Sequence, residues 1–509
     1  MAIEKYSGVA SANVSKVDGV TLLNIEKVDG VDRVSVFKFQ VDTSLGDGLA
    51  EYRLPFSNQG SFPYNCTVSW GDGTSDTITS YLDPAVDHTY STGGVYDITI
   101  VGVIGNFQTG DGAVNADKDK ISDVLSWGTN FTQGTFNGCT GLTVLSATGF
   151  PTNINEGLFN GCNSLTSGFA NWVLDASINL IFNSCSSFVG ADIDTWDVSS
   201  TTDMSSPFSG VASSFNPDLS SWNTGSATSM VSMFQNRPSF NQDLGSWDVS
   251  QVGQFDQMFR GANSFTNGGV SGVGVGLDQW QITNALDLQG MFRQASNFNC
   301  YIGSWNLNGV TDINRMFNGA SSFDQDLSGW DTSTVRDMGG LFESTPFNQD
   351  ISGWNTSQVR EMEYIFNGAS QFNQPIGSWN VSEVTTFNRS FVNADSFNQP
   401  LNSWNVAKVT DMTAMFQNND AFNQPINSWN TTLCSNMSSM FSGASVFNQD
   451  IGSWNTTGTN LSGMFSGATA YNNGGVGGVG AGIDQWDVTA NSSLIRMFDT
   501  ASSFNHSGS

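Results

Sequence analysis

Histidine, cysteine and carboxylate side chains are the groups in this chain that could perform catalysis or hold a metal ion. Only two histidines occur, His88 and His506. Neither stands in a pattern that would pair it with a serine or cysteine nucleophile and an acid, so we expect no catalytic triad. A zinc site, which usually needs several His and Cys ligands, is not expected for the same reason.

The six cysteines fall into an evenly spaced group and three in unrelated contexts. The spaced group is Cys139, Cys162 and Cys185, and the others are Cys66, Cys300 and Cys434. The spaced group occupies a position that Ala holds in later repeats, which favours small buried residues stacked in a core. A disulfide or a metal site is the alternative, although Cys-x-x-Cys pairs are missing from the group.

Carboxylates are abundant, but they recur at fixed positions of a repeat. Asp243, Asp326, Asp350 and Asp450 share one position, and Asp197, Asp248, Asp331 and Asp487 share another. Recurrence favours a structural or solvated role, because catalysis uses one irregular site, whereas retaining glycoside hydrolysis needs two carboxyls about 5 Å apart. We therefore predict a non-enzymatic protein without cofactors. Binding of Ca²⁺ by an acidic ladder is an alternative.

Those side chains belong to a repeat that covers most of the chain. A Trp returns about every 25 residues from Trp222 to Trp454, and a Phe, often within Met-Phe-x-x-Ala, keeps the same period from Phe136 to Phe498. A unit this short cannot bury its own apolar face, so successive copies must stack. The period predicts a mainly β chain with a solenoid of about 15 coils.

The recurring rings should face one continuous interior and form ladders of like residues along the stack. The rings expected in these ladders include Phe234, Phe317, Phe372, Trp379, Phe397, Trp404, Phe416 and Trp429. Between them, segments such as 359–366 space apolar residues three to four apart, which predicts a helical or 3₁₀ turn.

Two similar Gly/Val-rich insertions, at 267–276 and 472–482, interrupt the period. An insertion inside a coil would break the ladders, so we expect loops that project from one face. Loops of this kind often bind partners, and neutral surface excursions are the alternative. The candidate binding residues are Val270, Val273, Val275, Val476 and Val479.

The repeats resemble a known group of bacterial proteins. Phe136-Asn-Gly-Cys139 and Phe159-Asn-Gly-Cys162 are similar to BspA-type leucine-rich repeats, and later coils resemble the related 25-residue lipoprotein repeat. This resemblance implies a right-handed solenoid of leucine-rich-repeat type that serves adhesion and surface display. The coils expected to form it span residues 106–509.

A smaller module is expected before the solenoid, at residues 35–105, where short runs of alternating apolar and polar residues predict a β-sandwich. The motif from Val68 to Gly73 and the Asp-His-Thr-Tyr ending at Tyr90 resemble the polycystic-kidney-disease (PKD) type of immunoglobulin-like domain. In that family Trp70 and Tyr90 would be core residues. The resemblance implies a spacer or a carbohydrate-associated module.

The first 34 residues contain a duplicated Lys-Val-Asp-Gly-Val motif, at 16–20 and 27–31. Its Asp-Gly turn signals predict short strands rather than a helix. Such tandems resemble N-terminal segments of structural proteins of tailed bacteriophages, which implies docking onto a virion or another surface protein. A leader without a role of its own is the alternative.

The charge balance narrows the classes of partner. Lys and Arg number 17 against 46 Asp and Glu, a net charge of −29, which disfavours binding to nucleic acid. No run is long and apolar enough for a membrane helix, and the N-terminus lacks a basic stretch followed by an apolar run, so we expect neither membrane insertion nor a classical secretory signal.

Together these observations predict a virion or extracellular structural protein, such as a bacteriophage fibre, appendage or decoration subunit. Its solenoid would bind a glycan or protein on the host surface, and its N-terminal segment would bind other virion or surface proteins. A cellular surface adhesin of the BspA-like type is the main alternative. A carbohydrate-active enzyme built on a solenoid is the second.

Overall fold

The computed structural model describes residues 16–17, 20–21, 25–28, 31–34, 36–57, 63–110, 117–128, 131, 134–147, 156–476, 482–491 and 493–504. The chain divides into two compact units, residues 1–227 and 228–509. Over the described ranges there is no α-helix, and the regular structure consists of β-strands, isolated β-bridges and short 3₁₀ segments. The fold is therefore mainly β, as the sequence predicts.

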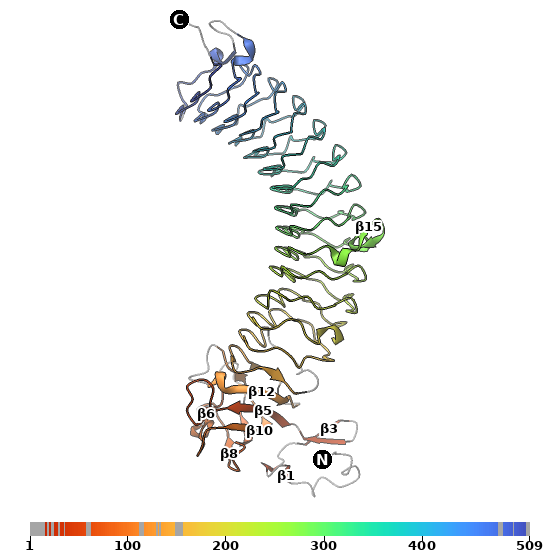
Figure 1. Ribbon diagram of the computed structural model, residues 1–509, viewed down its shortest axis with the longest axis vertical. Coiled ribbons are helices and arrows are strands. Elements are labelled where there is room, and N and C mark those ends of the chain that lie inside the picture. Colours follow the sequence, from red (N-terminus) through yellow and green to blue (C-terminus); the bar gives the residue numbers. More distant parts are fainter. Residues whose placement is uncertain are drawn as a thin grey trace. The chain divides into compact units, whose positions relative to one another are not determined.

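A six-stranded sheet forms the centre of the first unit (Figure 1). Its strands, in spatial order, are β14 (Val144–Leu145), β12 (Ile121–Ser126), β5 (Val36–Asp42), β10 (Val95–Val103), β7 (Asn65–Ser69) and β8 (Ser75–Ile78). In β5, the buried side chains of Phe37, Phe39 and Val41 alternate with half-buried polar ones. This period of two gives the strand one apolar face toward the core.

Shorter strand pairs complete the first unit. They are β1 (Lys16–Val17) with β2 (Val20–Thr21), β3 (Ile25–Val28) with β4 (Val31–Val34), β6 (Glu51–Arg53) with β9 (Asp87–Thr89), and β11 (Phe107–Gln108) with β13 (Gly134–Thr135). Its 3₁₀ segments are η3 (Pro84–Val86), η4 (Lys118–Lys120) and η5 (Ile193–Thr195). Both copies of the duplicated N-terminal motif thus contribute short strands.

The central sheet takes in strands on both sides of the boundary predicted after residue 105. β12 pairs with β5 in antiparallel register, and β14 pairs with β12 in parallel. The segment that leads into the repeats is therefore part of the same sheet as the strands before residue 105. The division into segments 1–34, 35–105 and 106–509 stays a prediction.

In the second unit, successive repeats stack beside one another through parallel backbone bridges, one per repeat (Figure 1). The bridging residues run Ser229, Gln254, Asp287, Asp312, Asp337, Glu361, Thr386, Asp411, Asn436, Asn460 and Ser493. Each repeat thus bonds to the repeat before and the repeat after it. This is the arrangement that a period too short to bury its own face requires.

Aromatic rings fill the interior of this stack. Phe317 lies 5.9 Å from Phe342 in the next repeat, with ring planes 5° apart, and 3.8 Å from Phe323 in its own repeat. Trp354 and Trp379 of neighbouring repeats are 6.3 Å apart and 2° from parallel. The two distances between neighbouring repeats lie within the usual 4.5–7 Å range for stabilising ring pairs, so the period of the sequence becomes a period of ring contacts.

The turn predicted for 359–366 is not a helix. Glu361 forms a parallel bridge on each side, and Tyr364 has a φ of 57°. A left-handed residue interrupts helical dihedrals, which leaves a single turn closed by the bond from the Asn367 N–H to the Tyr364 carbonyl at 3.0 Å. The three-to-four spacing of apolar residues therefore reflects a corner of the repeat.

Candidate functional site

The first Gly/Val-rich insertion forms a small hairpin on the repeat stack. It consists of η6 (Asn267–Gly269), β15 (Ser271–Gly272), β16 (Val275–Gly276) and η7 (Leu277–Gln279), and β15 pairs with β16 in antiparallel register. Figure 1 shows this hairpin, in green, standing out from one side of the stack. It therefore projects from the repeats, as the sequence predicts for this insertion.

Asn267 anchors the start of the hairpin. Its side chain is fully buried, and its Oδ1 accepts a hydrogen bond from the Leu244 N–H at 2.8 Å. Its Nδ2 donates to Asp243 Oδ1 at 2.8 Å and to the Val270 carbonyl at 3.1 Å. All three bonds are made in the interior, where an unpaired amide would be costly.

Asp278 anchors the end of the hairpin. Its Oδ2 accepts a hydrogen bond from the Gly274 N–H at 2.7 Å, and its Oδ1 accepts one from the Ser304 N–H at 3.0 Å. Ser271 adds a further link, since its Oγ accepts the Tyr301 N–H at 2.8 Å. The hairpin is thus fastened to neighbouring repeats at both ends and in its first strand.

The hairpin presents apolar side chains to solvent. Val273 at the turn is 76% exposed, and Val270 and Val275 are 36% and 43% exposed. Gly276, with φ 58°, closes the hairpin where a Cβ would lie 2.5 Å from the Val270 carbonyl oxygen. The structure thus brings these three predicted candidate residues together on one fixed element.

The second insertion starts and ends in the same way. Its 3₁₀ segments are η8 (Asn473–Gly475) and η9 (Gly482–Gln485). Asn473 is buried, accepts the Ile483 N–H at 3.0 Å and donates to the Val476 carbonyl at 2.6 Å. Val476 is half-buried, whereas Val479 lies outside the described residues.

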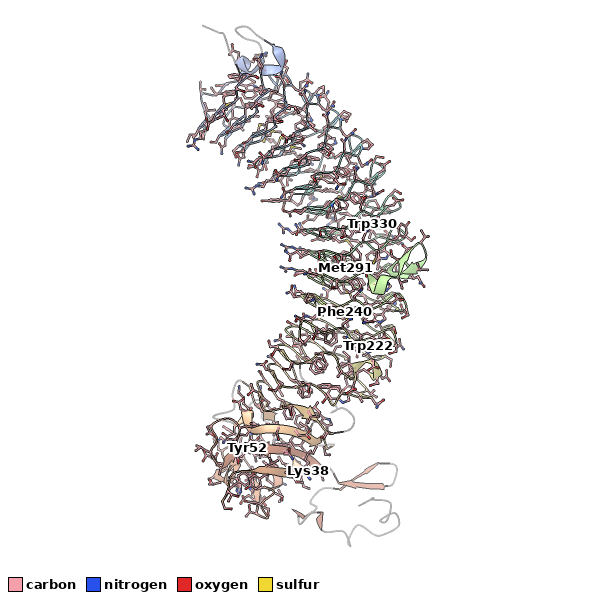
Figure 2. All side chains as sticks on the ribbon, viewed as in Figure 1. Lys38, Tyr52, Trp222, Phe240, Met291 and Trp330 are labelled. Atoms are coloured by element: carbon pink, nitrogen blue, oxygen red, sulfur yellow. The ribbon has the colours of Figure 1, made fainter. Side chains whose placement is uncertain are left out.

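The predicted ladder residues lie inside the stack, with exposed fractions of at most 3%. They are Phe234, Phe317, Phe372, Trp379, Phe397, Trp404, Phe416 and Trp429. Figure 2 shows the same packing around the labelled Phe240, Met291 and Trp330. These rings stabilise the stack of repeats from inside. Contacts with another molecule are therefore left to the exposed side chains of the repeats.

In the first unit, Trp70 and Tyr90 are both buried and in contact. The Tyr90 hydroxyl donates to the Trp70 carbonyl at 3.1 Å, and the ring of His88 stacks on Trp70 with centroids 4.6 Å apart. His88 Nε2 lies 2.8 Å from Asp72 Oδ2. Burial raises the pKa of Asp72, but hydrogen bonds from Thr74 and His88 outweigh it and hold that pKa at about 2. Through the contact between Asp72 and His88, the turn at residues 71–73 is bound to the buried aromatic rings.

All six cysteines are free and buried. Cys162 and Cys185 donate from Sγ to the carbonyls of Phe136 and Phe159, at 2.9 and 3.0 Å, in the preceding repeats. Burial raises the pKa of Cys185 to about 12. Within the described ranges, no group of three His, Cys, Asp or Glu side chains is placed to hold a metal ion.

The recurring aspartates that the sequence singles out close local turns. Asp331 Oδ1 accepts the Ser333 N–H at 3.0 Å, and Asp350 Oδ1 accepts the Ser352 N–H at 2.9 Å. A hydrogen bond from the Ser333 side chain, followed by the one from its N–H, lowers the pKa of Asp331. The Ser352 N–H, followed by its side chain, lowers the pKa of Asp350. Each carboxylate binds the amide two residues ahead, which is the usual role of Asp in a turn.

A second row of carboxylates was missed by the sequence reasoning. Asp287, Asp312, Asp337 and Glu361 occupy the bridging position of four successive repeats. Burial raises the pKa of Asp312 to about 6, and repulsion from Asp337 and Asp287 adds to that effect, although a hydrogen bond from the Asn314 N–H opposes it. The signal was present, since each of these residues stands five positions before a repeat Phe.

A further carboxylate, Asp256, lies near Asp287 but does not occupy the bridging position. Asp256 has its pKa raised to about 7, first by burial and then by a hydrogen bond and repulsion from Asp287. The Asp256 carboxyl therefore carries a proton in an appreciable fraction of molecules near neutral pH. The group is therefore a source of pH dependence.

A comparison with protein families assigns the repeats of this chain to a family. Among the described residues, no helix is long and apolar enough to cross a membrane. No curated protein and no solved structure compared with the chain matches it. A family model described as "Mycoplasma protein of unknown function, DUF285" matches residues 176–271, 268–374, 330–419 and 401–509. These matches together span the repeats from residue 176 to residue 509, and the chain belongs to this repeat family.

Proposed function

We propose that this chain is a non-enzymatic adhesion protein, which presents the hairpin of its first insertion to a ligand on another surface. The observation that carries the proposal is the exposure of Val270, Val273 and Val275 on an element fastened at both ends. Apolar side chains that project together are typical of contact sites, because they gain most when a partner covers them.

The anchoring favours a binding role over a neutral excursion. A loop that must be ordered on binding loses part of its binding energy to that ordering, and a loop already held in place does not. The side chains of Asn267 and Asp278 hold the hairpin with six hydrogen bonds, whose partners lie in the hairpin itself and in adjacent repeats. The chain thus supports these exposed valines with buried polar residues.

The scaffold in this proposal is a solenoid of leucine-rich-repeat type preceded by a PKD-like sandwich. Parallel bridges between successive repeats and ring ladders support the solenoid. The buried Trp70–Tyr90 pair beside antiparallel strands supports the sandwich. Stacked repeats beside a sandwich would suit a protein that presents a binding element on another surface.

The carrier in the favoured version is a bacteriophage particle, with the chain as a fibre, appendage or decoration subunit on its surface. Support comes from the duplicated Lys-Val-Asp-Gly-Val motif, which contributes strands β1 to β4. The ligand would then be a glycan or protein of the host surface. A cellular surface adhesin is the second candidate, and the family description, which names Mycoplasma, favours it.

The hairpin is tested by the triple substitution of Val270, Val273 and Val275 by Ser. Binding of the purified chain to arrays of bacterial polysaccharides and to immobilised cell envelopes should fall about tenfold or more, because each buried valine contributes about 1.5 kcal/mol or more. A chain with Leu286→Ser and Leu433→Ser, two residues of similar exposure elsewhere, is the matched control. Equal binding by the triple variant and the wild type would refute the hairpin site.

The carrier and the absence of catalysis are tested separately. Antibody against the chain should detect it in purified virions if the phage version holds, and in envelope fractions if the cellular version holds. Shortening of any array polysaccharide during incubation with the chain would contradict the non-enzymatic proposal.

A further inference from the structure

Arg260 and Arg315, in the repeats before and after that of Arg293, both lie within electrostatic reach of Arg293. Burial lowers the pKa of Arg293 most, and repulsion from Arg260 and Arg315 lowers it further. Arg260 and Arg293 occupy the same position of the repeat, directly after Phe259 and Phe292, whose rings stack 5.5 Å apart. The ring ladder thus sets the two guanidinium groups in one row.

A glycine in the same repeat, Gly290, lies beside the side chain of Arg293. Gly290, with φ 58°, stands where the next repeat has Arg315. A Cβ at Gly290 would lie 3.7 Å from Arg293 Cβ and 3.9 Å from its Cδ. The Arg293 side chain therefore runs beside a bare stretch of backbone, and its Nε donates to Asn318 Oδ1 at 3.3 Å.

The cluster of Arg260, Arg293 and Arg315 has no carboxylate at salt-bridge distance. In the described part of the second unit, the one salt bridge joins Lys408 to Glu383. Glu343 is the acid that favours the charged form of Arg293, but its two oxygens accept hydrogen bonds from Asn318 and Asn367.

Arg260 also has an unused donor. Its Nη1 donates to Gln257 Oε1 at 2.7 Å, whereas its buried Nε has no hydrogen-bond partner. A buried donor without a partner is costly, and a guanidinium offers such donors in a fixed planar fork. The Arg260 guanidinium thus has donor capacity that the described residues leave unsatisfied.

Different charged groups act on the acidic row and on the arginines. The charged groups that shift the pKa of Asp312 are Asp337 and Asp287, whereas those that shift that of Arg293 are Arg260, Arg315 and Glu343. The chain has a net charge of −29, yet among the residues that the structure describes no carboxylate forms a salt bridge with these arginines. At physiological salt, charges beyond about 8 Å are largely screened, so the local cluster governs what binds there.

We propose that Arg260, Arg293 and Arg315 form a binding site for the oxyanion groups, sulfate or carboxylate, of an acidic polysaccharide. Guanidinium forks bind such groups with two parallel hydrogen bonds, which single point charges do not offer. Repeats that stack at about 4.8 Å place Arg260 and Arg293 in one row, with Arg315 of the next repeat beside Arg293, which suits a polymer carrying charges at intervals. This site is separate from the hairpin, so either site can fail without the other.

The site is tested with dextran sulfate, carboxymethyl dextran and neutral dextran as immobilised probes for the full chain. We expect binding to one or both charged polymers, none to neutral dextran, and an affinity that falls as salt rises. Arg293→Gln should weaken binding about tenfold or more, since a charge-assisted pair contributes about 1.5–3 kcal/mol and about 1.4 kcal/mol is tenfold. The two charged polymers distinguish a sulfate site from a carboxylate site.

Arg496→Gln is the matched control, because it removes one exposed arginine from the last repeat and changes the net charge equally. Equal loss of binding in both variants would overturn the site in favour of a general charge effect. Binding to single-stranded DNA as tight as to dextran sulfate would overturn the polysaccharide class.

A second measurement is independent of polymer binding. Millimolar sodium sulfate, compared with sodium chloride at equal ionic strength, should raise the Tm of the wild type and of Arg496→Gln, because an anion bound to the folded state stabilises it. The same addition should raise the Tm of Arg293→Gln less. An equal rise in all three chains would contradict the proposal.

Discussion

The indole Nε1 of Trp379 donates a hydrogen bond to the carbonyl oxygen of Ile351, 28 residues earlier, at 3.0 Å. The same bond joins Trp354 to Leu327 and Trp404 to Ile376, each time between adjacent repeats. The tryptophan thus fills the interior with its ring and pairs a backbone carbonyl of the preceding repeat. This dual role explains why Trp, rather than another large apolar residue, recurs at this position.

Replacing Trp379 by Ala should lower the free energy of unfolding by about 3–5 kcal/mol, the usual cost of truncating a large buried ring. The substitution removes a ring that is 3% exposed and leaves the Ile351 carbonyl without its donor. Urea denaturation followed by circular dichroism measures the change. Leu286→Ala, at a residue that is 58% exposed, should cost less than about 0.5 kcal/mol.

Trp379→Phe separates the two roles of the side chain. It keeps an aromatic ring in the ladder but removes the donor, so it should cost about 1–3 kcal/mol, the range for a buried carbonyl left unpaired. A stability equal to that of wild type would show that the bond to Ile351 contributes little.

The free energy of unfolding should fall as the pH rises from about 4 toward 7, because of the carboxyl groups of Asp256 and Asp312. Their pKa values in the folded chain, about 7 and about 6, lie above the ordinary value of 3.8. Between the two values the folded state binds more protons than the unfolded state, so raising the pH favours unfolding. Asp256→Asn should flatten this decline, measured as the urea midpoint at pH 4.5 and 7.5.

Asp331→Asn is the control of opposite sign. Hydrogen bonds from Ser333 lower the pKa of Asp331, so its ionised form stabilises the fold above its ordinary pKa, and that contribution is lost as the pH falls. The Asn variant should therefore lose stability at pH 7.5 and little at low pH. The same pH response in both variants would contradict the assignment of the slope to Asp256.

The cysteines should be unreactive in the folded chain. All six are buried, and burial raises the pKa of Cys66 and Cys434 to about 12, so almost no thiolate is present at pH 8. Titration with Ellman's reagent should label the thiols only after addition of denaturant. Rapid labelling of a thiol in the native chain would show that the core opens near that residue.

Asn267→Ala should loosen the hairpin more than it destabilises the stack. It removes the acceptor for the buried Leu244 N–H and the bond to Val270, a loss of about 1–3 kcal/mol for the unpaired amide. Hydrogen exchange should then quicken at 267–276, while amides around Phe317 keep their protection. Uniform quickening along the stack would show that the hairpin and the repeats open together.

The ring positions were the part of the fold most open to prediction from sequence. Phe372 and Trp404 recur at a fixed period, and a period that short has one way to hide large rings, so their burial follows from the pattern. The insertion at 267–276 was also recognisable as a projection, because an extra segment inside a coil would break every ladder.

Other features depended on contacts between repeats that the sequence does not display. The three-to-four spacing at 359–366 is shared by a helical turn and by a corner with a left-handed Tyr364, and hydrophobic pattern alone does not separate them. Likewise, Arg293 and Arg315 belong to different repeats and are separated along the sequence. They become neighbours because successive repeats stack. In the sequence, the row is indicated only by the shared repeat position of Arg260 and Arg293, in Met-Phe-Arg at 258–260 and 291–293.

The one-bridge-per-repeat register has a mechanical consequence. A tensile load along the stack meets nearly the same set of bonds at each junction, from Asp287–Asp312 to Asn436–Asn460. Junctions of equal strength give way one after another, so such a tether would lengthen in small steps and dissipate work while the remaining coils stay intact. The same uniformity lets evolution add or delete whole coils and so adjust the reach of the molecule.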